Sequence, residues 1–108
     1  MKPELPRAVA LYLEAENSDR LDAIDECFAE DAQVRDEGQV FRGRDAIRTW
    51  KGAAKARYRY QVQPLSAQEQ DGTWQVRVQV TGSFPGSPVE LHYAIALQDE
   101  RIASLEIR

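Results

Sequence analysis

The spacing of apolar residues changes once along this chain, near Arg57, and that change limits the folds that the chain can adopt. Before Arg57, apolar side chains recur every three or four residues, as on one face of a helix. After it, they alternate with polar residues, as on a half-buried strand. A run of helices followed by a run of strands predicts an α+β fold. The length of 108 residues is typical of a single domain, spanning 1–108.

Three helices are expected in the first half of the chain. The first covers about residues 6–16 and places Tyr12 on its apolar face. The second should begin after Asp19, a residue that commonly caps helices, and end near Glu30. The third covers about residues 44–55, where apolar side chains again recur at helical spacing.

Extended segments account for most of the remaining residues. Two short extended pieces, 33–36 and 39–42, precede the third helix. After it, an antiparallel meander is expected, with a bulge or bend at Pro64, because proline cannot donate to the ladder. Asp71-Gly72 is a hairpin turn signal. The four expected strands of the meander cover residues 57–63, 74–80, 89–97 and 102–107.

One face of the expected sheet is polar, because the helices cannot cover both faces. Its residues are Arg59, Gln61, Gln75, Arg77, Gln79, Glu90 and His92. Isologous pairing of such a face is a common closed arrangement, so we expect a homodimer through the outer sheet face.

Composition excludes several classes of protein. Net charge is −4 and the basic residues are scattered, so a nucleic-acid surface is not expected. The single cysteine, Cys27, cannot form an internal disulfide and suits a reducing compartment. Cysteine and histidine are too few for a zinc site. No apolar run approaches the length of a membrane span, so we expect a cytoplasmic protein without a membrane partner.

Asp36 is the strongest candidate for chemistry. It follows Val34 by two residues, and residues two apart on a strand face the same side of the sheet. If Val34 points into the core, Asp36 follows it, and a carboxylate directed at an apolar interior is costly unless it is paired or used. Asp36 is therefore a candidate general base. The alternative is a surface carboxylate at a strand end, or one that caps the turn at Gly38.

Two stretches resemble a known superfamily. FAEDAQVRDEG (residues 28–38) and VFRGRDAIRTW (residues 40–50) are similar to the nuclear transport factor 2-like superfamily, which includes polyketide-cyclase-like and ketosteroid-isomerase-like proteins. The resemblance covers nearly the whole chain. It implies three N-terminal helices packed on a curved, mostly antiparallel sheet that forms a cone with an internal pocket. It does not settle activity, because this fold serves several functions.

Within the superfamily, residues 12–36 resemble the ketosteroid isomerases without a gap. That resemblance implies Tyr12 as an oxyanion donor and Asp36 as the proton-shuttling base. The family's second donor, an aspartic acid on a late strand, falls on Tyr93 here. The chain ends at Arg108, before the aromatic residues that close a steroid pocket, so the resemblance does not extend to a steroid ligand.

Several other side chains are expected either to pack in the core or to line the pocket. The expected pocket-lining residues are Phe28, Trp50, Tyr58, Trp74, Val76, Val78, Leu91, Ile95 and Leu105. Tyr12 and Tyr93 could equally be core aromatics. Glu16, one turn beyond Tyr12, is expected to be solvated, with the pocket mouth as the alternative. His92 alternates with the inward residues and should point away from Asp36, which leaves a nucleophilic triad without support.

The expected function is that of a small-molecule pocket protein. If it is an enzyme, it transfers a proton next to a carbonyl on an apolar ligand, as an isomerase or cyclase-like enzyme, with no metal or organic cofactor. The alternative is a non-catalytic ligand-binding or dimerisation domain of the same fold. A polar-tipped cavity at Tyr12 and Asp36 would favour chemistry, and a filled interior would favour a scaffold.

Overall fold

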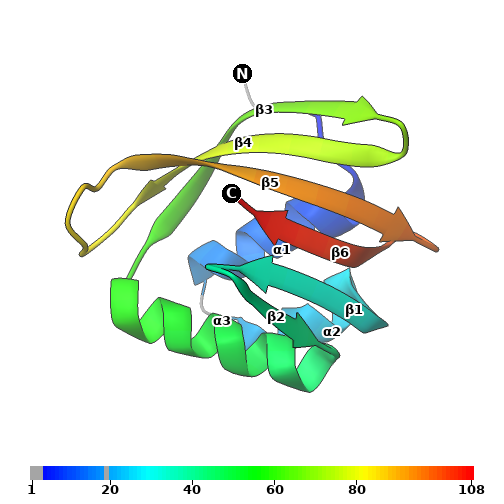
Figure 1. Cartoon of the computed structure of the whole chain (residues 1–108), viewed down its shortest axis with the longest axis horizontal. Coiled ribbons are helices and arrows are strands. Elements are labelled where there is room, and N and C mark those ends of the chain that lie inside the picture. The colour runs from blue at the N-terminus through cyan, green and yellow to red at the C-terminus, as the bar shows by residue number, and fades with distance from the viewer. Residues whose placement is uncertain (1–3, 19) are drawn as a thin grey trace.

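The computed structural model describes residues 4–18 and 20–108, and in them helices pack against one six-stranded sheet (Figure 1). The helices are α1 (Arg7–Ser18), the 3-10 turn η1 (Leu21–Ala23), α2 (Ile24–Cys27) and α3 (Arg44–Tyr58). The strands are β1 (Phe28–Asp36), β2 (Gln39–Arg42), β3 (Gln61–Gln70), β4 (Thr73–Thr81), β5 (Val89–Gln98) and β6 (Arg101–Ile107).

The sheet has the strand order β2-β1-β6-β5-β4-β3. All neighbouring strands are antiparallel except β1 and β6, which run parallel. Figure 1 shows the sheet curving from β2, beside α3, to the β3–β4 hairpin, with α1 behind it. The expected α+β class and the curved, mostly antiparallel sheet are confirmed, and the cone is open rather than a closed barrel.

The second helix is shorter than expected. Phe28 has an extended backbone and ends α2, so β1 begins there rather than at Gln33. Pairing with β6 explains the difference, because Phe28 lies opposite Ile102 and both side chains are fully buried. Tertiary pairing thus overrides a local pattern that also fits a helix. The expected cap at Asp19 lies outside the described residues.

The end of the third helix also differs from the expectation. The helix continues to Tyr58, and Arg59 then adopts a left-handed conformation (φ 45°) while its N–H donates to the carbonyl of Lys55 over 2.9 Å. The first strand of the meander therefore begins at Gln61. Tyr58 and Arg59 do not alternate along a strand, and Arg59 is not part of the outer sheet face. A left-handed helix cap at a residue other than glycine is hard to foresee from sequence.

Other local predictions are confirmed. The register between β3 and β4 shifts between Pro64 and Ser66, at the expected bulge. Asp71 and Gly72 form the tight turn that joins these strands, and both have positive φ. His92 is exposed on the outer face. On that face Arg77 and Glu90 form an ion pair at 3.1 Å, with both side chains about half exposed.

The core lies between α1, α3 and the inner face of the sheet. Val76 and Val78 on β4, Tyr93 and Ile95 on β5, and Val34 on β1 are at most 2% exposed. Burial of such apolar side chains is the main favourable term in folding, about 25 cal/mol for each Å² removed from water.

Two polar contacts fix the helices on the sheet. The side-chain amide of Asn17, near the end of α1, donates to the carbonyl of Val62 at 2.8 Å and accepts from its N–H at 2.7 Å. The guanidinium of Arg44, at the start of α3, donates to the carbonyl of Phe28 at 3.0 Å. In the described part of the chain, no helix is long and apolar enough to cross a membrane.

Cys27 should be protected from thiol reagents in the native protein. It is fully buried, its Sγ donates to the carbonyl of Ala23 at 2.9 Å, and burial raises the pKa of the thiol from 9.0 to about 12. At about pH 8 that difference leaves roughly a thousandfold less reactive thiolate than in the unfolded chain. We expect slow labelling by a disulfide reagent in buffer and fast, complete labelling in denaturant. Equal rates in the two conditions would contradict the buried position.

Candidate functional site

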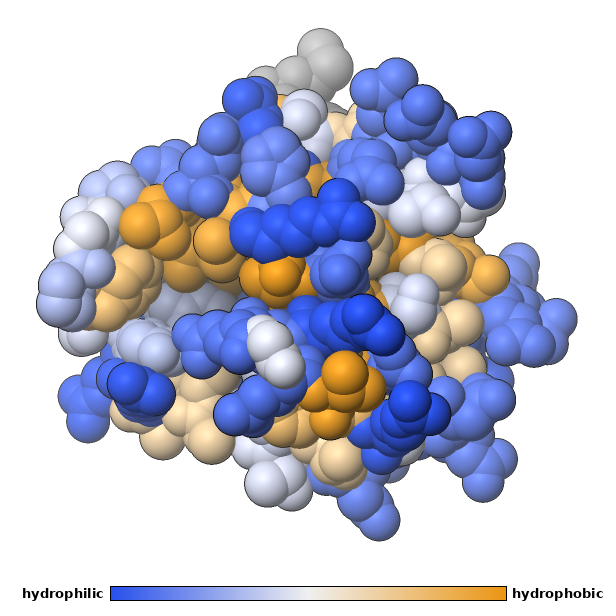
Figure 2. Space-filling model, in the orientation of Figure 1, coloured by the Kyte–Doolittle hydropathy of each residue, from blue (hydrophilic) through white to orange (hydrophobic). Residues whose placement is uncertain are grey.

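A cavity of about 420 Å³ lies between the C-terminal half of α3 and the connected ends of β4 and β5. Figure 2 shows the surface hollowed on the side where Figure 1 shows the β4–β5 loop, with hydrophobic surface above the hollow. Its apolar and aromatic wall consists of Trp50, Ala54, Tyr58, Tyr60, Val80, Phe84, Pro85, Val89, Leu91, Tyr93 and Ile107. Asp36, Glu37 and Lys51 complete it. A mostly apolar wall with a few polar groups is the usual form of a small-molecule site.

Tyr58 and Tyr60, just before β3, line the cavity at a point where two segments of the chain pass close to each other. A Cβ on Gly82 would lie 2.8 Å from the carbonyl oxygen of Tyr58 and 2.9 Å from the Cα of Tyr60. Glycine is therefore required where the end of β4 passes the α3–β3 connection. The N–H of Ser83 donates to the same Tyr58 carbonyl at 2.8 Å, which ties the rim of the cavity to the end of α3.

Asp36 lies at the last position of β1 and lines the cavity, half-buried. Val34 is fully buried on the same strand, as the alternation of side chains requires. The indole Nε1 of Trp50 donates to the Asp36 carboxylate at 3.1 Å. Phe41 on β2 stacks on Trp50, with 5.8 Å between ring centroids, and so holds the indole in place. The carboxylate is thereby oriented by one neutral donor.

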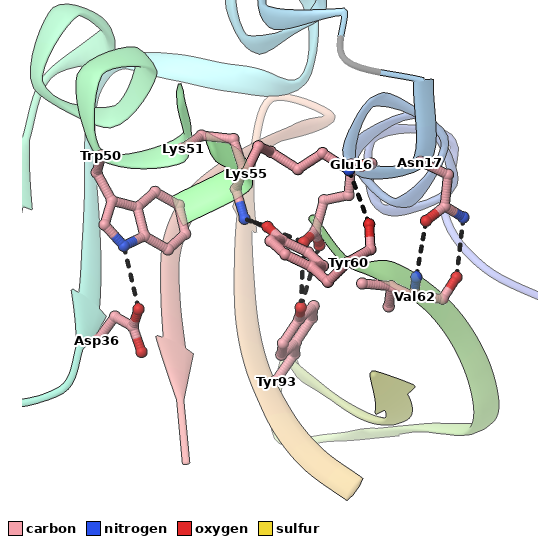
Figure 3. A network of polar contacts seen from close by, with 9 residues as sticks. All are labelled: Glu16, Asn17, Asp36, Trp50, Lys51, Lys55, Tyr60, Val62 and Tyr93. Atoms are coloured by element: carbon pink, nitrogen blue, oxygen red, sulfur yellow. Dashed lines mark hydrogen bonds and ion pairs between the residues drawn. The ribbon is translucent and has the colours of Figure 1, made fainter. Parts of the chain in front are cut away.

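A buried ion pair lies deeper in the same region. The Lys51 ammonium, on α3, lies 3.0 Å from the carboxylate of Glu16, on α1, and both side chains are at most 4% exposed. Lys51 also donates to the hydroxyl of Tyr60 at 2.6 Å, and the Tyr93 hydroxyl donates to Glu16 at 3.1 Å. Figure 3 shows Lys51, Tyr60 and Tyr93 converging around Glu16, with Asp36 and Trp50 to one side.

Burial shifts the proton affinities of this network. It lowers the pKa of Lys51 from 10.5, and the neighbouring Glu16 carboxylate partly opposes that shift. Burial also raises the pKa of Tyr93 well above 10.0, with Glu16 adding to the rise. Tyr93 is therefore a neutral hydroxyl that donates to the carboxylate. Lys51 is a stronger acid than a lysine in water.

The structure brings Asp36 and Tyr93 together on the cavity wall, but not Tyr12. Tyr12 is fully buried behind the wall, edge-to-face with Phe28 at 5.3 Å between ring centroids. Its hydroxyl has no hydrogen-bond partner among the described residues. Burial, together with the Glu16 carboxylate, raises the pKa of Tyr12 well above 10.0.

The expected pocket-lining residues divide into two groups. Trp50, Tyr58 and Leu91 line the cavity. The others belong to the hydrophobic core or pack against it, and they do not line this cavity: Phe28, Trp74, Val76, Val78, Ile95 and Leu105. Inward alternation identifies the buried face of a strand, but it does not show where that face is hollow.

Lys51 was not among the residues expected at the site, and Glu16 lies elsewhere than expected. The expectation of a solvated Glu16 is wrong, because this residue is 1% exposed. Both positions carry a signal in the helical spacing. Glu16 follows Tyr12 by one turn, and Lys51 follows Ile47 by one turn, so each lies on the inward stripe of its helix. Two opposite charges on inward stripes would be costly alone, and together they indicate a buried pair.

The fold and this pocket define a member of the nuclear transport factor 2-like superfamily. Within it, the chain belongs to the SnoaL-like domain family, whose sequence model matches residues 9–105. No curated protein matches the chain. In the described residues, no group of three or more histidine, cysteine, aspartate or glutamate side chains could hold a metal ion.

Solved structures agree with this assignment. A candidate polyketide cyclase from Sinorhizobium meliloti is 43% identical, with 96% of this chain and 95% of that chain covered and a TM-score of 0.92. A Catenulispora acidiphila protein with a ketosteroid isomerase-like fold, in complex with trimethylamine, is 20% identical, with 97% and 86% covered and a TM-score of 0.84. An LEH-like epoxide hydrolase from M. tuberculosis is 17% identical, with 94% and 79% covered and a TM-score of 0.77. The last two similarities concern the fold alone.

Replacing each buried tyrosine by phenylalanine should separate their roles in stability. Tyr12→Phe removes a hydroxyl without a partner, so we expect the free energy of unfolding to stay the same or rise by about 1 kcal/mol. Tyr93→Phe removes a donor to the buried Glu16 carboxylate and should lower it by about 1–3 kcal/mol. Urea titrations of both variants measure the difference. An equal loss in the two variants would contradict the assigned contacts.

Proposed function

We propose that this protein binds a small, mostly apolar molecule bearing a carbonyl group and transfers a proton next to that carbonyl, as an isomerase or cyclase-like enzyme. One observation carries the proposal: the Asp36 carboxylate lines an apolar cavity and is held there by the Trp50 indole. The reaction needs a base and a group that stabilises the enolate, so the proposal includes no metal or organic cofactor.

Asp36 suits the role of base because of its surroundings. Among the described residues, only the neutral N–H of Trp50 donates a hydrogen bond to its carboxylate, so it keeps lone pairs for a substrate proton. The aromatic and aliphatic wall would exclude water around the reacting carbon. A positioned carboxylate that takes a proton from one carbon can return it to another, which is the isomerisation of a β,γ-unsaturated ketone.

The comparisons support the ligand class. Membership of the SnoaL-like family and similarity to a candidate polyketide cyclase favour a carbonyl-bearing ligand. Polyketide cyclisation joins carbon atoms next to carbonyl groups, so it also begins with removal of a proton by a base. The alternative, a non-catalytic binding or dimerisation domain, has less support because the interior is hollow at Asp36.

Catalytic roles for Tyr93 and Tyr12 remain proposals, and the two roles have different support. Tyr93 lines the cavity, and its hydroxyl would have to exchange Glu16 for a ligand oxygen to act as an oxyanion donor. Tyr12 would act only through a rearrangement, because it lies behind the wall. The single free thiol remains the support for a cytoplasmic location.

Asp36→Asn should keep the fold and lose turnover of a model β,γ-unsaturated ketone by roughly a hundredfold or more, the usual scale for a positioned base. The amide keeps an oxygen that can accept from Trp50, so stability should change little. Isomerisation can be followed by the absorbance of the conjugated product. Asp31→Asn is a matched control, because Asp31 is exposed on the same strand and does not line the cavity.

Binding can be measured separately from turnover. The chain has two tryptophans, and of these only Trp50 lines the cavity. In the Trp74→Phe variant, quenching of the remaining fluorescence by a ketone therefore reports occupancy. Quenching without turnover in the wild-type protein would leave a binding protein. Turnover that is unchanged in Asp36→Asn would remove Asp36 as the proposed base.

The outer sheet face also supports a homodimer. It carries Arg77, Glu90 and His92, which are exposed and lie on the face away from the core. Sedimentation equilibrium at tens of micromolar should give about twice the chain mass of 12.3 kDa. Glu90→Arg, which leaves two like charges side by side on this face, should shift the equilibrium toward monomer. A wild-type monomer at that concentration would contradict the pairing.

A further inference from the structure

Lys51 lines the cavity, but proton transfer by Asp36 alone gives this buried lysine no role. Of the residues that line the cavity, it is the only one with a cationic side chain. Glu16, its partner, does not line the cavity and lies behind the wall formed with Tyr60 and Tyr93. Lys51 is therefore the member of the ion pair that lines the cavity, and Glu16, on α1, is the member that does not.

The ammonium keeps one donor for a ligand. Two of its three N–H groups donate to Glu16 and Tyr60, at 3.0 and 2.6 Å. No third acceptor lies within hydrogen-bonding distance among the described residues. The ammonium also lies 4.1 Å from the ring centroid of Trp50 and 5.2 Å from that of Tyr12. Trp50 also lines the cavity, and its N–H binds Asp36.

We propose that Lys51 is the electrophilic group of this site: its ammonium donates a hydrogen bond to the carbonyl oxygen of the ligand and stabilises the enolate that forms there. The inference rests on the proposed function and names the group that the family resemblance assigned to tyrosines. Its preferred ligands are uncharged ketones and enolisable dicarbonyls, and phenols that ionise to resemble the enolate.

The proton balance of the step is simple. The Asp36 carboxylate takes a proton from the carbon next to the carbonyl, and the electron pair of that C–H bond moves onto the carbonyl oxygen. The oxygen accepts a hydrogen bond from Lys51 without taking its proton. Asp36–H then returns the proton to the far carbon of the enolate, which restores the carbonyl and the free carboxylate.

The surrounding contacts favour Lys51 over the tyrosines for this role. The Tyr93 hydroxyl already donates to Glu16, and Tyr12 does not line the cavity. Burial lowers the pKa of the Lys51 ammonium and so strengthens it as a hydrogen-bond donor, while Glu16 favours the charged form. Charge held in place in a water-poor site stabilises a developing anion more strongly than in water.

A coloured phenol tests the proposal without catalysis. 4-Nitrophenol absorbs differently as phenol and as phenolate, so its spectrum when bound reports its protonation. At a pH below the ionisation of the free phenol, wild-type protein should bind the phenolate, with the apparent pKa of the bound phenol lowered by about one to three units. In Lys51→Met the bound phenol should be neutral, and the preference for the phenolate should fall by about tenfold or more.

The variants are chosen so that loss of folding cannot imitate the result. Lys51→Met leaves Glu16 buried without its cation, so the double variant Glu16→Gln/Lys51→Met, which removes both charges, is measured beside it. Lys55→Met is the matched control. Lys55 lies one turn further along α3 and donates to the main-chain carbonyls of Glu16 and Tyr60, but it does not line the cavity. Thermal unfolding confirms which variants are folded.

Each outcome decides the inference. Phenolate binding by wild type, Lys55→Met and Asp36→Asn, with neutral phenol in the folded Lys51 variants, supports it. Phenolate binding that survives in a folded Lys51 variant overturns it, as does neutral phenol or no bound phenol in wild type. Failure of the proposed base appears elsewhere, as unchanged turnover in Asp36→Asn, so the two hypotheses fail separately.

Discussion

The rest of the site depends on the ion pair between Glu16 and Lys51. It joins the end of α1 to the middle of α3 in a region where both side chains are almost fully buried. Bringing two charges out of water costs several kcal/mol for each ion, which their attraction offsets only when the remaining hydrogen bonds are made. Tyr60 and Tyr93 make them, at 2.6 and 3.1 Å. The pair therefore fixes α1, α3, β5 and the approach to β3 at one point, and the cavity lies beside that point.

The position of Asp36 follows from a second constraint, the hairpin of β1 and β2. Asp36 pairs with Gln39 next to the turn of that hairpin, so its side chain comes at the end of β1, where Trp50 of α3 reaches it. Trp50 meets it there and also contacts Lys51, which lies next to it in sequence. One residue on α3 thus contacts both Asp36 and Lys51. A single rigid side chain thus lies between the Asp36 carboxylate and the Lys51 ammonium.

The class of fold could be predicted from the sequence because it depends mainly on the local spacing of apolar side chains along each helix and strand. The strands 73–81, 89–98 and 101–107 and the first helix follow from side-chain alternation or spacing, and the bulge at Pro64 follows from the missing N–H of proline. The prediction that Asp36 follows Val34 inward also needed only that period. The segment at Phe28 and the ion pair were beyond this reasoning, because they depend on residues distant in sequence: Phe28 pairs with β6, and Glu16 meets Lys51 across 35 positions. The helical spacing shows that each of these two charges lies on the inward side of its helix, but it does not show which residue each charge meets.

The charged residues that line the cavity suggest why its ligand should be neutral when it binds. Asp36 and Glu37 line one part of the wall, and a carboxylate ligand would be repelled there, while a cation would be opposed by Lys51. A neutral carbonyl compound meets neither penalty, and its oxygen can accept from Lys51. In the proposed reaction, negative charge moves from Asp36 to the oxygen beside the ammonium when a proton leaves the carbon of the ligand. On this proposal the site binds the charged intermediate more strongly than the neutral ligand, and such a difference in binding accelerates a reaction.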